Sequence, residues 1–399
     1  MKFGVFYNPM VPRAPGQQDW DPGQESRAFT EMLEQIRFAD SLGFDYAFLG
    51  EHHFMPEYAH NSATEVLLGA LAATTRNIRL GTGIVHASHN DPVRVAERIA
   101  TIDQVSGGRT EFGFGPGTPL EIAPFLKDDA AARNERSASA AQIAVDILST
   151  RGVWPGTSGE FFSYPPVNVV PKSFQDPHPP LWTSTSRPGM AAGVASRGLG
   201  QLMLTLAGPE SVAAEVAAYW HTLRTADVRP VGKGINPAVF TFTIGLVAPT
   251  DELADQRARE GVEFFGFGLT GGAPAGVSDP GHHLWDAFTD FKAGRGDIRT
   301  RAGVPDMMLQ MGARFADLAG TMMCGPEKAR QFTAAIEQTH ADGLLLNQQF
   351  GHTKHEYLME SLEIWGTQII PEFREREAEH QAWRKKQLDG LNLPVVTSV

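Results

Sequence analysis

Cysteine and long apolar runs are what this chain has least of. Its 399 residues include one cysteine, Cys324, so no internal disulfide can form and a reducing, cytoplasmic location is compatible with the composition. Cys324 lies in a methionine-rich run, TMMCGP, and we expect it to be packed rather than reactive. No apolar run is long enough to cross a bilayer, and the first residues, KFGVFYN, indicate a strand rather than a signal peptide. We therefore expect a cytoplasmic protein with no membrane partner.

Basic residues are also in short supply. The 34 Lys and Arg are outnumbered by 46 Asp and Glu, which gives a formal net charge of −12. Binding to nucleic acids or anionic membranes needs clustered Lys and Arg, so we expect no nucleic-acid partner. The acidic residues are spread along the chain, and ordinary solubility is enough to explain them.

The sequence motifs of several other enzyme classes are missing. Four histidine pairs invite a metal interpretation, but none has the carboxylate and helical spacing of HExxH, so we predict no metal site. These pairs are His52/His53, His86/His89, His282/His283 and His352/His355. A serine nucleophile would need a G-x-S-x-G elbow, which is absent. The run GFGPG (Gly113–Gly117) resembles a dinucleotide loop, but Pro116 interrupts it.

What the chain does have is a repeated alternation of apolar strands and amphipathic helices. Strand followed by helix, in units of about 30 residues, is typical of a parallel sheet covered by helices, and eight such strands close a barrel. We predict an α/β fold, a (β/α)8 TIM barrel with insertions. The predicted strands are Lys2–Tyr7, Asp45–Gly50, Ile78–Val85, Thr110–Phe114, Leu181–Thr185, Gln201–Thr205, Phe240–Ala248 and Gly343–Asn347.

Three segments interrupt this pattern. We expect one barrel domain over residues 1–380, with insertions at about 151–180 and 266–320, and a partly solvated tail over 381–399. The first insertion is rich in Pro, Gly and aromatics and suggests a hairpin. The second lacks periodicity and reads as a long loop, and its Phe and Trp residues suggest a lid over something apolar.

The most informative stretch is DYAFLGEHHF, where Glu51, His52 and His53 follow a buried strand. Catalytic residues of parallel barrels lie at the carboxyl ends of the strands, and histidine can exchange a proton near neutral pH. An ordinary loop with solvated histidines is the alternative. Position and chemistry together favour a catalytic role.

The order of the motifs resembles the bacterial luciferase family of flavin-dependent monooxygenases. The resemblance rests on EHHF, on RLGTGIVHASHNDPVRVAERIATIDQVSGGRTEFGFGPG and on PLWTSTSRPGMAAGVASRGLG, and it is strongest from Lys2 to Gly117. It implies a barrel that binds reduced flavin at its carboxyl face. Members of the family use FMNH2 supplied by a separate reductase, or in some cases the deazaflavin F420. The FMN users react with O2 through a flavin C4a-(hydro)peroxide that oxygenates the substrate.

The resemblance implies roles for single residues of the first half of the chain. His52 matches the catalytic histidine of the family, and Glu51 matches the adjacent acid, whose role could be catalytic or only to orient loops. Packing and function are both open for His53. Gly83 and Ile84 match a dipeptide that is often joined by a cis bond beneath the flavin ring. Arg109 matches an arginine that neutralises the flavin phosphate, a task that suits a guanidinium.

A second phosphate-binding segment follows the predicted strand Leu181–Thr185. A hydroxyl, a cation and free amides at a helix start can bind an anion, which makes Ser186 and Arg187 candidates for the phosphate, with Thr185 lining the site. The SRPG sequence departs from the luciferase pattern, which has an acid and a serine at Ser186 and Arg187, and it resembles other members instead. The place is therefore better defined than the individual contacts.

The sequence thus predicts an FMNH2-dependent monooxygenase, one component of a two-component system, acting on a small apolar organic compound. The expected partners are O2, a flavin reductase and a second copy of the chain in a homodimer. The alternative is an F420-dependent oxidoreductase that transfers hydride on the same barrel. A non-catalytic flavin-binding protein is a third interpretation, against which the intact EHHF argues.

Overall fold

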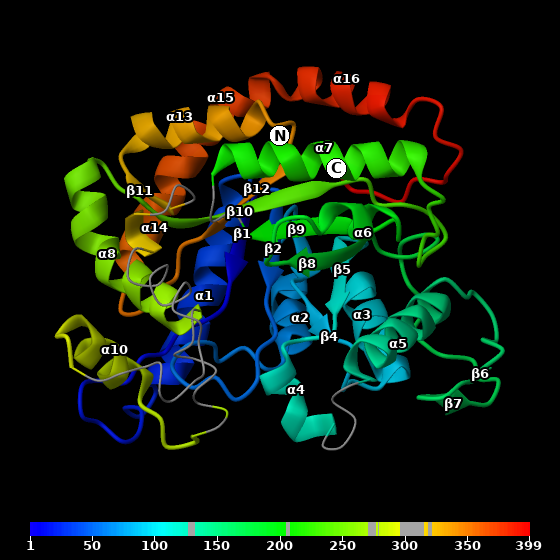
Figure 1. The fold of residues 1–399 in the computed structure, drawn as a ribbon, viewed down its shortest axis with the longest axis horizontal. Coiled ribbons are helices and arrows are strands. Elements are labelled where there is room, and N and C mark those ends of the chain that lie inside the picture. The colour runs from blue at the N-terminus through cyan, green and yellow to red at the C-terminus, as the bar shows by residue number, and fades with distance from the viewer. Residues whose placement is uncertain (127–131, 205–207, 270–276, 278, 296–314, 318–320) are drawn as a thin grey trace.

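The computed structural model centres on a closed ring of parallel strands (Figure 1). It describes residues 1–126, 132–204, 208–269, 277, 279–295, 315–317 and 321–399. Around the ring the order is β12-β1-β2-β3-β5-β8-β9-β10, and β10 pairs with β12 to close it. These strands are β1 (Lys2–Tyr7), β2 (Tyr46–Leu49), β3 (Arg79–Thr82), β5 (Thr110–Gly115), β8 (Leu181–Thr185), β9 (Gly200–Leu204), β10 (Val239–Val247) and β12 (Gly343–Asn347).

The predicted (β/α)8 barrel is confirmed, and each of its eight strands lies where the alternation placed it. The predicted strand Ile78–Val85 is divided into β3 and the short β4 (Val85–His86), which pairs with β5. Residue 205, predicted as the end of one strand, lies outside the described residues. An additional strand, β11 (Thr321–Cys324), pairs with the outer part of β10.

Helices cover the outside of the ring (Figure 1). They are α1 (Gln24–Ser41), α2 (Thr64–Thr74), α3 (Pro92–Ser106), α5 (Arg133–Leu148), α7 (Pro209–Thr225), α8 (Asp251–Phe267), α13 (Pro326–Glu337) and α14 (His355–Ile364). Shorter helices are α4 (Pro119–Leu126), α6 (Ala191–Ala195), α10 (Leu284–Lys292) and α15 (Ile370–Glu375). A π-helical turn, Trp365–Ile369, joins α14 to α15.

Helix α3 shows how local sequence sets the element bounds. The Asp91 carboxylate accepts the backbone amides of Val93 and Arg94 at 2.9 and 3.0 Å, and Pro92 occupies the first turn. The helix ends at Gly107, whose φ of 66° suits glycine. Helix α2 has no side-chain cap, because its N-cap residue is Ala63, and the side-chain amide of the nearby Asn61 donates to the carbonyl of Gly50.

The inside of the barrel is filled by large aromatic side chains facing glycines. Phe48, Trp182 and Phe240 are fully buried there. A Cβ at Gly81 would lie 2.2 Å from the ring of Phe48, and one at Gly200 would lie 2.5 Å from the ring of Trp182. Small and large residues therefore alternate between neighbouring strands, so the interior is a packed core and not a channel.

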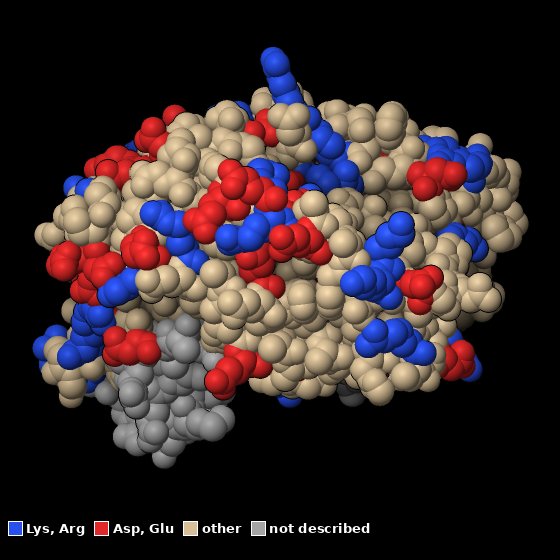
Figure 2. All heavy atoms as spheres, turned by 90° about the horizontal axis from the view of Figure 1, so that it is seen from above, with Lys and Arg blue, Asp and Glu red and all other residues tan. Residues whose placement is uncertain are grey.

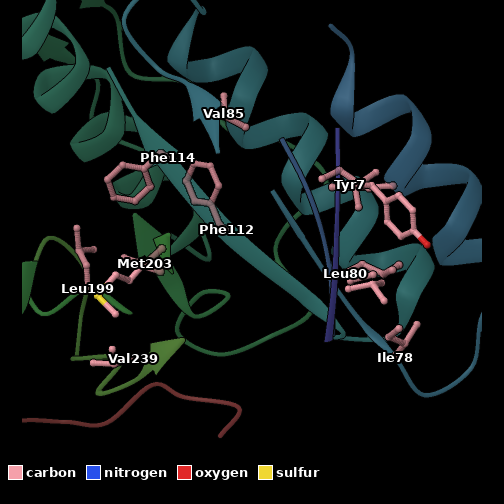
Figure 3. Packing of buried hydrophobic residues seen from close by; sticks show 14 of the residues in the cluster. Tyr7, Ile78, Leu80, Val85, Phe112, Phe114, Leu199, Met203 and Val239 are labelled. Atoms are coloured by element: carbon pink, nitrogen blue, oxygen red, sulfur yellow. The ribbon is translucent and has the colours of Figure 1, made fainter. Parts of the chain in front are cut away.

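A second layer of apolar side chains lies between the strands and the helices. Figure 3 shows part of it, with Tyr7 of β1, Leu80 of β3, Phe112 of β5 and Met203 of β9. This cluster extends to α2, α3, α5 and α7, so the helices bury one face each against the ring. Cys324 of β11 belongs to the same cluster, and its burial raises the pKa of the thiol to about 12, which confirms the prediction of a packed cysteine.

The first insertion contains the expected hairpin, formed by β6 (Thr157–Ser158) and β7 (Ser163–Tyr164). In the second, 270–276, 278, 296–314 and 318–320 lie outside the described residues. The aromatics expected in a lid, among them Phe264, Trp285 and Phe288, are buried against one another in a cluster formed by α8 and α10. These described aromatics pack against one another within that cluster.

The tail after residue 380 is partly exposed, as expected, and it is also folded against the rest of the chain. Helix α16 (Glu377–Leu388) continues through it, and Trp383 packs edge-on against Trp220 at a centroid distance of 5.5 Å. The last residues then cover the amino end of the barrel, where the Ser398 hydroxyl donates to the carboxylate of Glu111. In this way the C-terminus seals the end of the barrel opposite Glu51.

Two surface properties bear on partners. Figure 2 views the molecule from above Figure 1, the side on which α16 lies, and shows basic and acidic side chains interspersed there. Within the described part of the chain, no helix has the length and apolar character needed to span a membrane.

Candidate active site at the carboxyl end of the barrel

The site begins with the loop after β2, where His52 meets a carboxylate from α4. His52 Nδ1 lies 2.9 Å from Oε1 of Glu121. Glu121 is completely buried, and it also accepts the backbone amide of His53 at 3.0 Å and the hydroxyl of Thr118 at 2.6 Å. The main chain of the loop is fixed as well, since the His52 amide donates to the carbonyl of Asn61. Both the ring and the backbone of His52 are thus held in place.

The electrostatics of this pair define which ring nitrogen carries a proton. Burial raises the pKa of Glu121, but the hydrogen bond and charge of His52, together with His86 and Thr118, outweigh it and lower the pKa to about 2. An ionised carboxylate only accepts, so Nδ1 of His52 is the donor. The side chain of His52 is 23% exposed, and among the described residues Nε2 has no hydrogen-bond partner. That nitrogen is free to give or take a proton.

Glu121 was missed by the sequence analysis, although a signal exists. Thr118-Pro119-Leu120-Glu121 has the form of a capping box with proline at the first helical position. The pattern predicts a helix start after β5, and therefore a carboxylate at the catalytic end of the barrel. It does not predict that this carboxylate turns to His52.

Glu51 lies next to His52 in sequence but its side chain points elsewhere. Its Oε1 accepts from Nε2 of His53 at 2.9 Å and from the side-chain amide of Asn90 at 3.3 Å. Its Oε2 accepts the backbone amide of His86 at 3.2 Å. Burial raises the pKa of the Glu51 carboxyl. Glu51 therefore joins the loop after β2 to the loop after β4.

Two further histidines, His86 and His89, form a cluster with Glu51 and His53. Nδ1 of His86 and Nε2 of His89 lie 3.9 and 3.7 Å from Oε1 of Glu51. Burial lowers the pKa of His86 to about 3 and that of His89 to about 4, so both rings are neutral at pH 7. The meeting of His86 and His89 with Glu51 depends on how two loops fold, so the spacing of the histidine pairs along the sequence does not predict it.

Gly83 and Ile84 lie beside the same loop and are joined by a cis peptide bond, as the resemblance implied. The amide of Gly83 donates to the carbonyl of Leu49, two residues before Glu51. A Cβ on Gly83 would lie 2.8 Å from the ring of Phe6. Glycine is therefore required for this close approach of backbone to the barrel core.

The segment after β8 is partly as expected. Thr185 is buried, and its hydroxyl accepts from the side-chain amide of Gln201 at 2.9 Å. Ser186 and Arg187 are exposed in the following loop. Helix α6 begins only at Ala191, and the amide of Ala191 donates to the carboxylate of Glu215 at 3.0 Å. The Gly189 amide donates to the same carboxylate. These two amides are not free for a phosphate, which leaves the side chains of Ser186 and Arg187.

The assignment of Arg109 to the flavin phosphate is wrong. Arg109 precedes β5, so it lies at the amino end of the barrel, whereas Ser186 follows β8 at the carboxyl end. Its guanidinium donates to the carbonyls of Ala72, Thr75, Ile78 and Ser106, and to the hydroxyl of Thr75. Arg109 thus satisfies the last carbonyls of α2 and has a structural task.

Buried amide side chains at the mouth of the barrel test whether a flavin would fit. Asn8 follows β1, and Asn347, Gln348 and Gln349 end or follow the neighbouring β12. The side-chain oxygens of all four are buried and have no hydrogen-bond partner in the described part of the chain. The side chain of Gln348, however, donates to the hydroxyl of Ser361 on α14, outside the barrel, so only Asn8, Asn347 and Gln349 belong to the mouth. Unmet acceptors are costly unless a ligand supplies donors. The N–H groups of a flavin ring are such donors, so the site fits the cofactor that the resemblance implies.

A separate groove of about 670 Å³ lies between α2 and α3 on the outside of the barrel. Glu51, His53 and His89 form part of its wall, together with Asn90 and the cis-proline segment at Val170 and Pro171. The histidine cluster around Glu51 is therefore reached from this groove.

Comparison with known proteins agrees with the fold. The family model described as luciferase-like monooxygenase matches residues 1–343. The chain belongs to this family, which confirms the resemblance read from the sequence and the expectation of an oxidoreductase at the level of the family.

The curated relatives span several substrates. The chain is 32% identical over 199 residues to the uncharacterized protein y4wF of Sinorhizobium fredii, which covers 50% of this chain and 54% of that protein. It is 28% identical over 193 residues to the oxygenase component of flavin-dependent trigonelline monooxygenase of Acinetobacter baylyi, covering 47% and 50%. Limonene 1,2-monooxygenase of Rhodococcus erythropolis is 27% identical over 300 residues, 73% of each chain. The chain thus spans about half the length of the first two relatives.

Solved structures share the fold at low identity. Monooxygenase RslO1 from Streptomyces bottropensis superposes with a TM-score of 0.68 at 22% identity, covering 94% of this chain and 100% of that chain. The oxygenating constituent of 3,6-diketocamphane monooxygenase from Pseudomonas putida, in complex with FMN, gives 0.67 at 17%, covering 93% and 98%. An F420-dependent secondary alcohol dehydrogenase gives 0.63 at 15%, covering 91% and 97%.

Proposed function

We propose that this protein is an FMNH2-dependent monooxygenase that inserts an atom of O2 into a small organic substrate. The observation that carries the proposal is the His52–Glu121 pair at the carboxyl end of β2, beside the backbone of Gly83 and Ile84. It places a proton donor and acceptor where a parallel barrel carries its chemistry. The family assignment and a structural neighbour that binds FMN support the same cofactor.

Each residue then has a defined task. The ionised Glu121 keeps the proton of His52 on Nδ1, so that Nε2 exchanges a proton with the reacting oxygen. Gly83 and Ile84 present backbone beneath the flavin ring, and Ser186 and Arg187 hold its phosphate, with Thr185 behind them. The amide oxygens of Asn8 and Gln349 accept hydrogen bonds from the ring. Reduced FMN, when bound, supplies the two electrons that activate O2.

The role of Glu51 differs from that of His52. Because its carboxylate bonds to His53 and to the amide of His86, we assign it to holding the two loops together rather than to proton transfer. This is the orienting role that the sequence analysis left open for it. In the proposed reaction Glu51 is a positioning residue.

The second candidate is an F420-dependent oxidoreductase. It is favoured by structural neighbours that use F420, and by curated relatives that include a 5,10-methylenetetrahydromethanopterin reductase from Archaeoglobus fulgidus, 27% identical over 205 residues. Hydride transfer needs no O2, so the two candidates differ in whether product forms anaerobically.

Three further parts of the proposal concern partners. We propose that a separate reductase supplies FMNH2, that the substrate is a small apolar compound, and that the chain forms a homodimer through α2 and α3. Val66 of α2 and Val105 of α3 are 72% and 51% exposed, which an interface would cover. The cytoplasmic location expected from the sequence stays a prediction.

The test supplies photoreduced FMN or reduced F420 to the purified protein with a panel of terpenes, ketones, aldehydes and aromatic compounds. We expect O2-dependent product with reduced FMN alone. Product formed anaerobically with reduced F420 would favour the second candidate, and tight binding of neither cofactor would overturn both. Light scattering at micromolar concentration tests the homodimer.

A further inference from the structure

We propose that Glu51, His53, His86 and His89 form a binding site for a divalent transition-metal ion of the Zn²⁺ class. Their nearest ligand atoms all lie within 4.8 Å of one another. Four ligands of a tetrahedral Zn²⁺ at about 2.0–2.1 Å from the metal would lie about 3.3 Å apart. Small side-chain movements would therefore close the site around an ion.

The bonding within the cluster leaves ligand atoms without a partner. His86 is 4% exposed, and its Nδ1 faces Oε1 of Glu51 at 3.9 Å without a hydrogen bond to any described residue. Nε2 of His89 faces the same oxygen at 3.7 Å, and only a long contact of 3.4 Å to Asn90 competes for it. Buried ring nitrogens usually bond to protein, water or metal. These two point at one carboxylate oxygen instead.

The charge of Glu51 is also unbalanced. In the described part of the chain its ion-pair partners are the three histidines, with no Lys or Arg among them. Histidine is not a permanent cation, so this buried carboxylate has no fixed positive charge beside it, and a divalent ion would supply one.

The ligand types select the class of metal. Three imidazoles and one carboxylate suit Zn²⁺ and similar first-row ions, whereas Mg²⁺ and Ca²⁺ prefer oxygen ligands only. Asn90 already bonds to Oε1 of Glu51, and Arg98 donates to the side-chain oxygen of Asn90 at 3.0 Å. These contacts orient the carboxylate in the way that outer groups orient metal ligands. Glu51, His53 and His89 also line the groove between α2 and α3.

Such an ion would tie the loop after β2 to the loop after β4, with His52 between two of the ligands. The test of this site needs no flavin. Untagged protein is stripped with a chelator and titrated with Zn²⁺ by calorimetry at pH 7.5, and with Co²⁺ by visible absorption. We expect one equivalent of Zn²⁺ per chain and the intense absorption of four-coordinate Co²⁺.

The double variant His86→Ala/His89→Ala should weaken Zn²⁺ binding by more than about 100-fold. His221→Ala, an exposed histidine on α7, is the matched control and should bind as the wild type does. Circular dichroism reports whether the double variant folds, and His89→Ala alone replaces it otherwise. Failure of the wild type to bind one equivalent, a six-coordinate Co²⁺ spectrum, or equal binding by the variant would overturn the proposal and leave the cluster as a hydrogen-bonded network only.

Discussion

The contacts of Glu121 allow a quantitative prediction for its neutral analogue. In Glu121→Gln the side-chain oxygen can still accept from His52 and from the amide of His53, because the new NH2 group can face the Thr118 hydroxyl, which rotates to accept. The geometry survives and the charge is lost. A hydrogen bond to a charged group contributes about 1.5–3 kcal/mol, and a neutral one contributes about 0.5–1.5 kcal/mol. Replacing the charged acceptor of His52 by a neutral one therefore weakens this hydrogen bond by about 1–1.5 kcal/mol. That corresponds to about a tenfold lower kcat/KM.

Glu121→Ala removes the acceptor altogether. The amide of His53 and the Nδ1–H of His52 are then left without their partner, each at a cost of about 1–3 kcal/mol. We expect about a hundredfold loss of kcat/KM and a lower free energy of unfolding. Glu327→Gln, an exposed glutamate at the start of α13, controls for the substitution itself and should change neither quantity.

Two assays measure the effect. Oxygen-dependent turnover with reduced FMN, on the substrate found in the panel, gives kcat/KM. Nitrogen-15 NMR of histidine-labelled protein reports the tautomer of His52, which should be the Nδ1–H form in the wild type and in Glu121→Gln, but mixed in Glu121→Ala. If Glu121→Ala keeps both the tautomer and the rate, the pair is not part of the mechanism.

Three further outcomes follow from other contacts. Arg109→Ala should lower the free energy of unfolding in urea by about 3 kcal/mol or more, through lost bonds to backbone carbonyls, and leave the affinity for reduced FMN unchanged. An altered affinity would return Arg109 to the site. Arg187→Ala should raise the Kd for FMN about tenfold but not that for riboflavin, and an equal effect on both would exclude a phosphate contact. Nδ1 of His178 donates to the carbonyl of Pro179, and its Nε2 accepts the backbone amide of Lys233. Burial lowers the pKa of His178 in the folded protein. Its contribution to the free energy of unfolding is therefore complete above about pH 6.5 and is lost as the pH falls below that value. Between pH 7 and 5 the unfolding free energy of His178→Gln should fall less steeply than that of the wild type, and equal slopes would contradict this.

The barrel could be predicted because its determinants are local. A strand buried on both faces is a short apolar run between turn residues, and the helices between the strands carry caps such as Asp91 and Gly107. The position of His52 at the end of β2 followed from the same pattern. Order along the chain fixes which end of the barrel each loop lies on, and this argument also explains the error at Arg109, which precedes its strand instead of following it.

The contacts between loops could not be predicted in this way. The carboxylate of Glu121 is 69 residues from His52, and the cluster of Glu51 with His86 and His89 depends on the exact paths of two loops. The tail is a similar case, because Trp383 gains its partner, Trp220, from an element more than 150 residues earlier. Such contacts leave no repeating pattern and no fixed spacing in the sequence, so they become visible only in the folded chain.

The most direct test is a single turnover under ¹⁸O2, with reduced FMN bound to the protein and the substrate found in the panel. The account predicts one ¹⁸O atom in the product, a strongly reduced yield for His52→Ala, and retained binding of the flavin by that variant. Product without ¹⁸O, or an equal yield from His52→Ala, would contradict it.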